Sequence, residues 1–161
     1  MSGEVIKSFA SPPGTPRGLA FDGKYLWSSL PGVDKIYQLD LDGKAIKSFA
    51  SPSTYPMGLA FDGKYLWNSD YDADKIYQLD LDGKVIKSFA SPSTGPRGLA
   101  FDGKYLWHCD RDVGEIYQLD LDGKVIKSFA SPSALPTDLA FDGKYLWHCD
   151  YGASRIYQIA R

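Results

Sequence analysis

The chain carries a histidine-cysteine-aspartate tripeptide twice, at residues 108–110 and 148–150. Imidazole and thiolate are the usual ligands of zinc and other soft metals. If these side chains form a metal site, its ligands are His108, Cys109, His148 and Cys149. The spacing within each tripeptide argues against such a site, because successive residues of a β-strand point to opposite faces of the sheet. We therefore expect packing positions and no cofactor, with a metal site as the alternative.

An acidic stretch, DYDADK at residues 70–75, resembles the first half of a calcium-binding loop. An EF-hand loop needs glycine at its sixth position and glutamate at its twelfth. This chain has Lys75 and Leu81 at those places, so we expect a solvated acidic loop instead. No nucleophile is paired with a base at a spacing that indicates a catalytic dyad, and we expect no catalytic residue.

All of these stretches belong to a sequence that repeats every 40 residues. The segment LAFDGKYLW begins at Leu19, Leu59, Leu99 and Leu139, and IKSFASP begins at Ile6, Ile46, Ile86 and Ile126. A fixed period of this length predicts an architecture in which each period is one supersecondary unit.

Each period contains four short strand signals, which in the first copy cover residues 18–22, 25–28, 36–41 and 44–49. The dipeptides Asp22-Gly23 and Asp42-Gly43 predict tight hairpins within this unit. Four antiparallel strands with apolar residues on both faces are typical of a propeller blade. We therefore predict an all-β fold, a β-propeller forming one domain over residues 1–161. Its blades are expected at about 17–50, 57–90, 97–130 and 137–160.

The phase of the repeat predicts how the ring closes. The chain starts with a fourth-strand signal at residues 4–10 and ends after a third-strand signal at residues 156–159. The N-terminal strand is thus expected to complete the last blade and remove both open sheet edges.

Four blades in one chain allow two kinds of ring. A four-bladed ring demands steep wedges between blades, whereas large aromatic side chains on both faces suit the flatter packing of larger rings. Closed homodimers are also the commonest oligomers. We expect an eight-bladed ring built from two copies, with a four-bladed monomer as the alternative.

The blade sequence resembles a known group of propellers. The pattern P-x-G-L-A-F-D-G-K-Y-L-W at residues 16–27, followed by IYQLDLDGKVIKSF at residues 76–89 in the next copy, is similar to the NHL, streptogramin-lyase and plant-type glutamine-cyclotransferase group. The resemblance implies the fold for the whole chain. For the lyases it implies histidines with a magnesium ion, and for the cyclotransferases acidic and aromatic channel residues that bind a glutaminyl end. Neither set can be placed on this chain residue by residue.

The repeats differ mainly in two loops, at residues 12–18 and 28–35 of the first copy and their equivalents. Both loops of a four-stranded blade emerge on one face of the disc, where variable loops on a rigid frame commonly carry function. Unconstrained drift of the loops is the other explanation. Arginines at the channel mouth could hold an anion. The candidate ligand-binding residues are Arg17, Tyr55, Met57, Asp70, Arg97, Arg111, Thr137 and Tyr151.

Composition narrows the class of function. A net charge of -2 gives no electrostatic reason to expect nucleic acid. No apolar run of 18 residues indicates a membrane span, and the first residues do not resemble a signal peptide, so we expect a soluble, cytoplasmic protein. The near-identity of the blades fits a recently amplified or an engineered repeat. We predict a non-catalytic symmetric scaffold whose partners are a second copy and a small molecule or peptide on the loop face. The alternative is an enzyme of the lyase or cyclotransferase kind with a metal in its channel.

Overall fold

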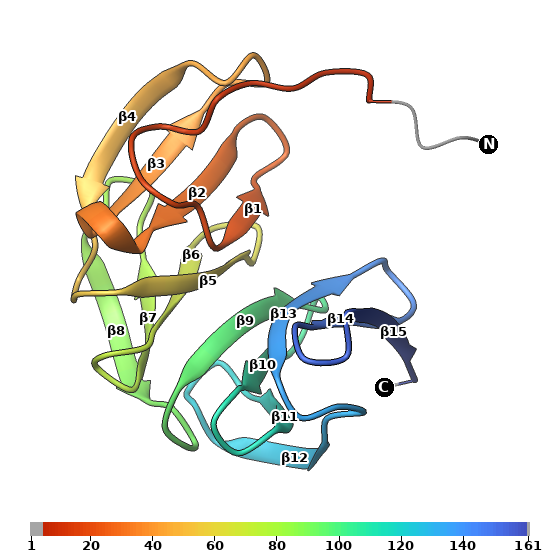
Figure 1. The fold of residues 1–161 in the computed structure, drawn as a ribbon. Helices are drawn as coiled ribbons and strands as arrows, with labels where there is room; N and C mark the ends of the chain where they lie inside the picture. Colours follow the sequence, from red (N-terminus) through yellow and green to blue (C-terminus); the bar gives the residue numbers. More distant parts are fainter. Residues whose placement is uncertain (1–4, 161) are drawn as a thin grey trace.

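The computed structural model describes residues 5–160, which form four antiparallel sheets around a common axis, a four-bladed propeller arrangement (Figure 1). Blade 1 contains β1 (Leu19–Phe21), β2 (Leu26–Leu30), the short 3-10 helix η1 (Pro31–Val33), β3 (Lys35–Leu39) and β4 (Ala45–Ala50). Blade 2 contains β5 (Pro56–Phe61), β6 (Leu66–Asp70), β7 (Lys75–Leu79) and β8 (Val85–Ala90). Blade 3 contains β9 (Pro96–Phe101), β10 (Leu106–Asp110), β11 (Glu115–Leu119) and β12 (Val125–Ala130). Blade 4 contains β13 (Pro136–Phe141), β14 (Leu146–Asp150) and β15 (Arg155–Ile159).

The repeated aspartates hold the hairpins, which confirms the predicted turns. The carboxylate of Asp62 accepts hydrogen bonds from the backbone N–H groups of Lys64 (2.9 Å) and Tyr65 (2.7 Å) and from the indole of Trp67 (2.7 Å). Gly63 between them has φ +96°, a conformation that glycine adopts without steric cost. The same three bonds recur in every blade, which explains why FDGKYLW is identical in all four copies.

The hydrophobic core lies between blades rather than within them. We call the side of a blade that carries its alanine, tryptophan and isoleucine the trailing face, and the opposite, leucine-rich side the leading face. Between blades 1 and 2, Trp27 and Ile36 of the trailing face pack against Leu59, Leu66 and Leu79 of the next leading face. The equivalent residues fill the interfaces between blades 2 and 3 and between blades 3 and 4. Blades 2 and 3 therefore bury apolar side chains on both of their faces, each against a neighbouring blade.

The inner strands approach each other closely at a repeated glycine. A Cβ added at Gly18 would collide with the carbonyl oxygen of Met57, and one added at Gly58 would collide with that of Arg97. A Cβ at Gly98 would lie 2.5 Å from the Cα of Asp138. Three successive interfaces thus have no room for a side chain at this position, while the fourth blade carries Asp138 there.

The prediction that the N-terminal strand completes the last blade is wrong for the described residues. Residues 5–18 contain no strand, and blade 4 has only β13, β14 and β15 in its sheet. Residue 4, where the strand was expected to begin, lies outside the described part of the chain. The N-terminal segment instead contacts blade 1, because its side chains fit the β3–β4 turn of that blade.

These contacts repeat those of the outer strands. Lys7 pairs with Asp42 in the same way as Lys47 pairs with Asp82 (2.6 Å) and Lys87 with Asp122 (2.7 Å). Phe9 covers Gly43 as Phe49 covers Gly83 and Phe89 covers Gly123. Residues 7–9 therefore take the place of an outer strand in a blade before blade 1, and the inner strands of that blade are absent.

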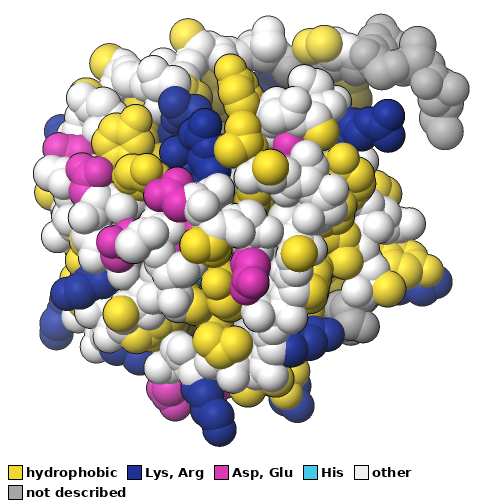
Figure 2. Space-filling view, turned by 60° about the horizontal axis from the view of Figure 1, so that its bottom comes forward, with side chains coloured by type: hydrophobic (Ala, Val, Ile, Leu, Met, Phe, Trp, Pro, Cys, Tyr) yellow, Lys and Arg dark blue, Asp and Glu magenta, His cyan; other side chains and the backbone are white. Residues whose placement is uncertain are grey.

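Two blade faces have no neighbouring blade, although the N-terminal segment lies beside the one on blade 1, where Leu39 is buried. Ile156 on the trailing face of blade 4 is 73% exposed and Leu19 on the leading face of blade 1 is 61% exposed, whereas Ile36 is 0% and Leu59 is 3% exposed. In the described part of the chain, β13 and β1 form no interface comparable to the other three. Figure 1 shows the gap between β1 and β13, and Figure 2 shows hydrophobic side chains on that side of the molecule.

Candidate functional site

The variable loops surround one cavity of about 300 Å³ at one end of the central channel. The two loops of a blade are tied together by backbone hydrogen bonds, from Tyr71 N to Tyr55 O (3.2 Å) and from Arg111 N to Gly95 O (3.3 Å). This confirms that both loops lie on the same face. The cavity is lined by Arg17, Tyr55, Arg97, Arg111, Thr137 and Tyr151, six of the eight predicted ligand-binding residues.

Arg97 is the most buried of the lining residues, with 9% of its surface exposed. Its guanidinium lies 4.7 Å from the ring centre of Tyr71, and its Nη1 donates to the sulfur of Met57 at 3.9 Å. Its Nε has no hydrogen-bond partner. Burial, together with the positive charges of Arg111 and Arg17, lowers the pKa of Arg97. The cavity therefore contains a cation that the protein leaves poorly compensated.

Aromatic rings support the other lining side chains. The rings of Tyr55 and Tyr71 are 5.9 Å apart, and the guanidinium of Arg111 lies 5.9 Å from the ring centre of Tyr151. The hydroxyl of Thr137 donates to Leu135 O at 3.1 Å. Sequence reasoning missed Tyr71, although its place in the variable loop beside Asp70 was a usable signal.

Met57 and Asp70 do not line the cavity. Met57 is buried next to Arg97. Asp70 is buried as well, and its Oδ1 accepts a hydrogen bond from Ala73 N (3.0 Å), so it holds the β6–β7 turn. Burial raises the pKa of Asp70 to about 6. Asp70 therefore does not lie at the predicted ligand-binding position beside the cavity, because the acidic loop turns inward at this residue, while Asp72 of the same loop is exposed.

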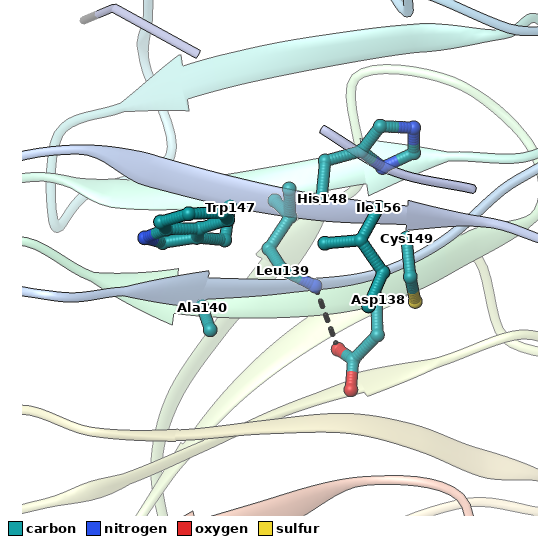
Figure 3. A pocket seen from close by; sticks show the side chains of 7 residues that line it. All are labelled: Asp138, Leu139, Ala140, Trp147, His148, Cys149 and Ile156. Atoms are coloured by element: carbon teal, nitrogen blue, oxygen red, sulfur yellow. Dashed lines mark hydrogen bonds between the residues drawn. The ribbon is translucent and has the colours of Figure 1, made fainter. Parts of the chain in front are cut away.

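The four candidate metal ligands lie apart. His108 is buried and stacks on Tyr117 at 5.8 Å, and its Nε2 is 3.1 Å from Ser91 Oγ. His148 repeats this arrangement with Tyr157 and Ser131. Figure 3 shows that His148 and Cys149 point to opposite sides of their sheet. Residues 5–160 contain no cluster of three or more His, Cys, Asp or Glu side chains placed to hold one metal ion.

Burial favours the uncharged forms of His108 and Cys109. Burial lowers the pKa of His108 to about 3 and raises the pKa of the Cys109 thiol, which lies near Asp138. The thiol is therefore protonated at neutral pH, and thiolate is the form that binds metals. Among residues 5–160, no set of side chains fits the histidines and magnesium ion that the lyase resemblance implies.

Cys109 takes the place of a serine in blades 1 and 2. Ser29 and Ser69 each accept a hydrogen bond from the inner-strand glycine of their own blade (2.8 and 2.9 Å) and donate to a carbonyl of the next blade, Met57 O and Arg97 O respectively. Cys109 keeps the first of these bonds, from Gly98 N at 3.2 Å. The cysteine is thus a packing position at a blade interface.

A second hollow lies on the uncovered trailing face of blade 4 (Figure 3). It is lined mainly by apolar side chains, including Ala140, Trp147 and Ile156. Asp138 is at its inner edge and accepts a hydrogen bond from Leu139 N at 2.9 Å. Burial raises the pKa of Asp138 to about 7. The sequence carried a signal for this residue, since Asp138 replaces a glycine present in the other three copies.

Comparisons with known proteins extend the description of the fold. No family model and no curated protein matches the sequence. Among solved structures, the Myxococcus xanthus glutaminyl cyclase is similar with a TM-score of 0.77 at 16% identity, over 89% of this chain and 65% of that one. The Staphylococcus aureus virginiamycin B lyase gives 0.69 at 21% identity, over 100% of this chain and 61% of that one. The computationally designed Ika4 protein gives 0.69 at 16% identity, over 98% of both chains.

These similarities concern the fold. The chain spans less than two thirds of the length of the cyclase and of the lyase. Within residues 5–160, no helix has the length and apolar character needed to cross a membrane. The chain is a β-propeller whose fold is similar to those of glutaminyl cyclase, virginiamycin B lyase and the designed Ika propellers, at low sequence identity.

Proposed function

We propose that this chain is a non-catalytic propeller scaffold in which two copies close one eight-bladed ring and present the varied loop face to a ligand. The observation that carries the proposal is the pair of uncovered faces at the ends of the chain. Blade 4 exposes a trailing face and blade 1 exposes a leading face, and every interface within the chain joins one face of each kind.

The N-terminal segment supports association. Lys7 and Phe9 already occupy the outer-strand place next to blade 1. The sheet of blade 4 lacks an outer strand among the described residues. If blade 4 of a second copy enters the gap beneath this segment, it gains the missing outer strand and its Trp147 and Ile156 become buried. Complete burial of one large apolar side chain contributes about 1.5–3 kcal/mol, and a dimer of this kind has two such interfaces.

Asp138 favours a second copy over closure of one chain on itself. The inner strands already touch at Gly18, Gly58 and Gly98. A four-bladed ring needs steeper wedges, which would press the inner strands closer together, and Asp138 carries a side chain where the others have none. A larger ring has a wider inner edge and leaves room for this carboxyl group.

The absence of a catalytic role is part of the same proposal. The imidazoles of His108 and His148 stack within sheets, and neither lines the loop-face cavity. That cavity is lined by arginine, tyrosine and threonine side chains. These residue types bind and orient a ligand through hydrogen bonds and charge, and none of them is placed here against a general base.

The experiment is a solution mass measured by light scattering at micromolar protein. We expect twice the mass of one chain for the wild type and the mass of one chain for Ile156→Glu, because the glutamate would have to be buried in the new interface. Ile126→Glu is the matched control: Ile126 is an equally apolar strand residue that is 46% exposed on an outer strand, so its variant should remain a dimer. A wild-type mass of one chain together with a full β-sheet circular dichroism spectrum would rule out the eight-bladed dimer.

A further inference from the structure

Three guanidinium groups meet at the loop-face cavity without an acidic partner. Arg17, Arg97 and Arg111 all line it. Within residues 5–160, the ion pairs involve three lysines and His108, and none involves these arginines. The chain as a whole has a net charge of -2, so this concentration of positive charge is local.

The burial of Arg97 indicates that the cavity is a binding site rather than an irregularity of the surface. More than nine tenths of its surface is buried, and its Nε has no hydrogen-bond partner. A buried charge without a partner is costly, and such groups in folded proteins are normally paired. The guanidinium lies over the ring of Tyr71, 4.7 Å from its centre, and the only hydrogen bond that it donates within the described part of the chain goes to the weak acceptor Met57 Sδ.

The repeat itself shows that the fold does not need an arginine here. Met57 holds the equivalent position in blade 2 and is 3% exposed. The scaffold therefore accepts an apolar side chain of similar length at this place. We therefore expect Arg97 to lower the stability of the free protein, and the charge of a bound anion to offset that loss.

We propose that the cavity binds a small phosphorylated anion with at least two negative charges, held by Arg97, Arg111 and Arg17. Guanidinium groups match phosphate and carboxylate oxygens with paired hydrogen bonds. The arginines reach the cavity from blades 1 and 3, so they approach from different directions. A tetrahedral phosphate accepts hydrogen bonds from several directions, whereas a carboxylate accepts them close to one plane. The volume of about 300 Å³ fits a ligand of the size of a diphosphate.

The contacts of Arg97 and Arg111 do not depend on how the ring closes. Arg97 and Arg111 belong to blade 3, and Tyr55 and Tyr71 belong to the loops of the adjacent blade 2. These two blades share an interface inside one chain. Binding by Arg97 and Arg111 is therefore independent of the proposed dimer, whereas the contribution of Arg17 from blade 1 depends on how the ring closes. A monomeric protein that binds the anion would support the site and contradict the dimer.

The experiment uses inorganic pyrophosphate as the probe, in calorimetric titration and in thermal melts at low ionic strength, with sodium chloride at matched ionic strength as the reference. We expect heat of binding and a higher melting temperature with pyrophosphate. Arg97→Met should weaken binding at least about tenfold, equal to about 1.4 kcal/mol. Without ligand, the same variant should melt at a higher temperature than the wild type. Lys64→Gln removes one positive charge from the hairpin on the opposite face and should bind like the wild type.

The other possible results of these titrations and melts either support or overturn the anion site. No heat and no change in melting temperature relative to chloride would overturn the proposal, and so would equal binding by wild type and Arg97→Met. Tighter binding of citrate than of pyrophosphate would overturn the assignment to phosphate. If Arg97→Met does not fold, as judged by circular dichroism, Arg111→Gln provides the same test at a partly exposed loop position. In that case unchanged affinity contradicts the site and a loss of at least tenfold supports it.

Discussion

Replacing Asp138 should change how the stability of the protein depends on pH. Burial raises the pKa of Asp138 to about 7 in the folded chain, while an unfolded aspartate has a pKa near 3.9. At a pH between these two pKa values, the carboxyl group of Asp138 is deprotonated in the unfolded chain and protonated in the folded chain. Unfolding therefore becomes easier as the pH rises from about 4 to about 7, and the effect is constant above that range.

The size of this effect follows from the shift. Each unit of pKa difference corresponds to about 1.4 kcal/mol, so a shift of about 3 units gives about 4 kcal/mol as an upper bound. Asp138 is partly exposed at the edge of the open face, and solvent reduces the penalty, so we expect about 2 kcal/mol. Asp138→Asn keeps the volume and removes the charge. Its free energy of unfolding relative to wild type should rise by this amount between pH 4.5 and pH 7.5.

The assay is urea unfolding followed by tryptophan fluorescence at several pH values. Taking the difference between variant and wild type removes the contributions of other titrating groups such as Asp70. Asp138→Gly, which restores the glycine of the other blades, should show the same pH dependence of the difference. It should also allow a closer contact between inner strands. A difference that is flat with pH, or one that falls as the pH rises, would refute the reasoning from burial.

Two further predictions concern packing. Changing both cysteines, Cys109→Ser with Cys149→Ser, should alter the free energy of unfolding by less than about 1 kcal/mol, because serine already makes two hydrogen bonds at the equivalent Ser29 and Ser69. EDTA should not change the melting temperature of the wild type or of the double variant. A lower melting temperature with EDTA in the wild type alone would indicate a bound metal. Asp62→Ala should lower the free energy of unfolding by about 2–4 kcal/mol, because three hydrogen-bond donors lose their acceptor, one of them the indole of buried Trp67. Thermal melts would measure this loss, with Lys64→Gln, which removes only a side-chain charge, as the control. Equal melting temperatures of the two variants would contradict the prediction.

The blade structure could be predicted from the sequence because its determinants are local. Asp22 and Gly23 form a turn within a few residues, and alternating residues such as Leu26 and Trp27 assign the two faces of a strand. The position of the N-terminal segment could not be predicted in this way. The side chains of Lys7 and Phe9 fit blade 1 whether or not the last blade lies beneath them, so the repeat phase alone did not fix the pairing.

The candidate site was predictable in its location and less so in its details. Comparison of the four copies located the variable face and six of the residues around the cavity. It did not show that Asp70 turns inward, because burial of a loop carboxylate depends on packing between loops far apart in the chain. It also did not distinguish exposed from buried arginines, and the burial of Arg97 against Tyr71 became visible only in three dimensions.

The sameness of the three interfaces has a consequence for folding kinetics. Because every trailing face fits every leading face, a blade has several acceptable neighbours on its own chain and on others. During synthesis the blades emerge in order, and each new blade meets the face of the one just before it. A full-length chain diluted from denaturant offers all of its faces at once, so wrongly ordered contacts within and between chains compete with the correct ones. The yield of refolding should therefore fall as the protein concentration rises.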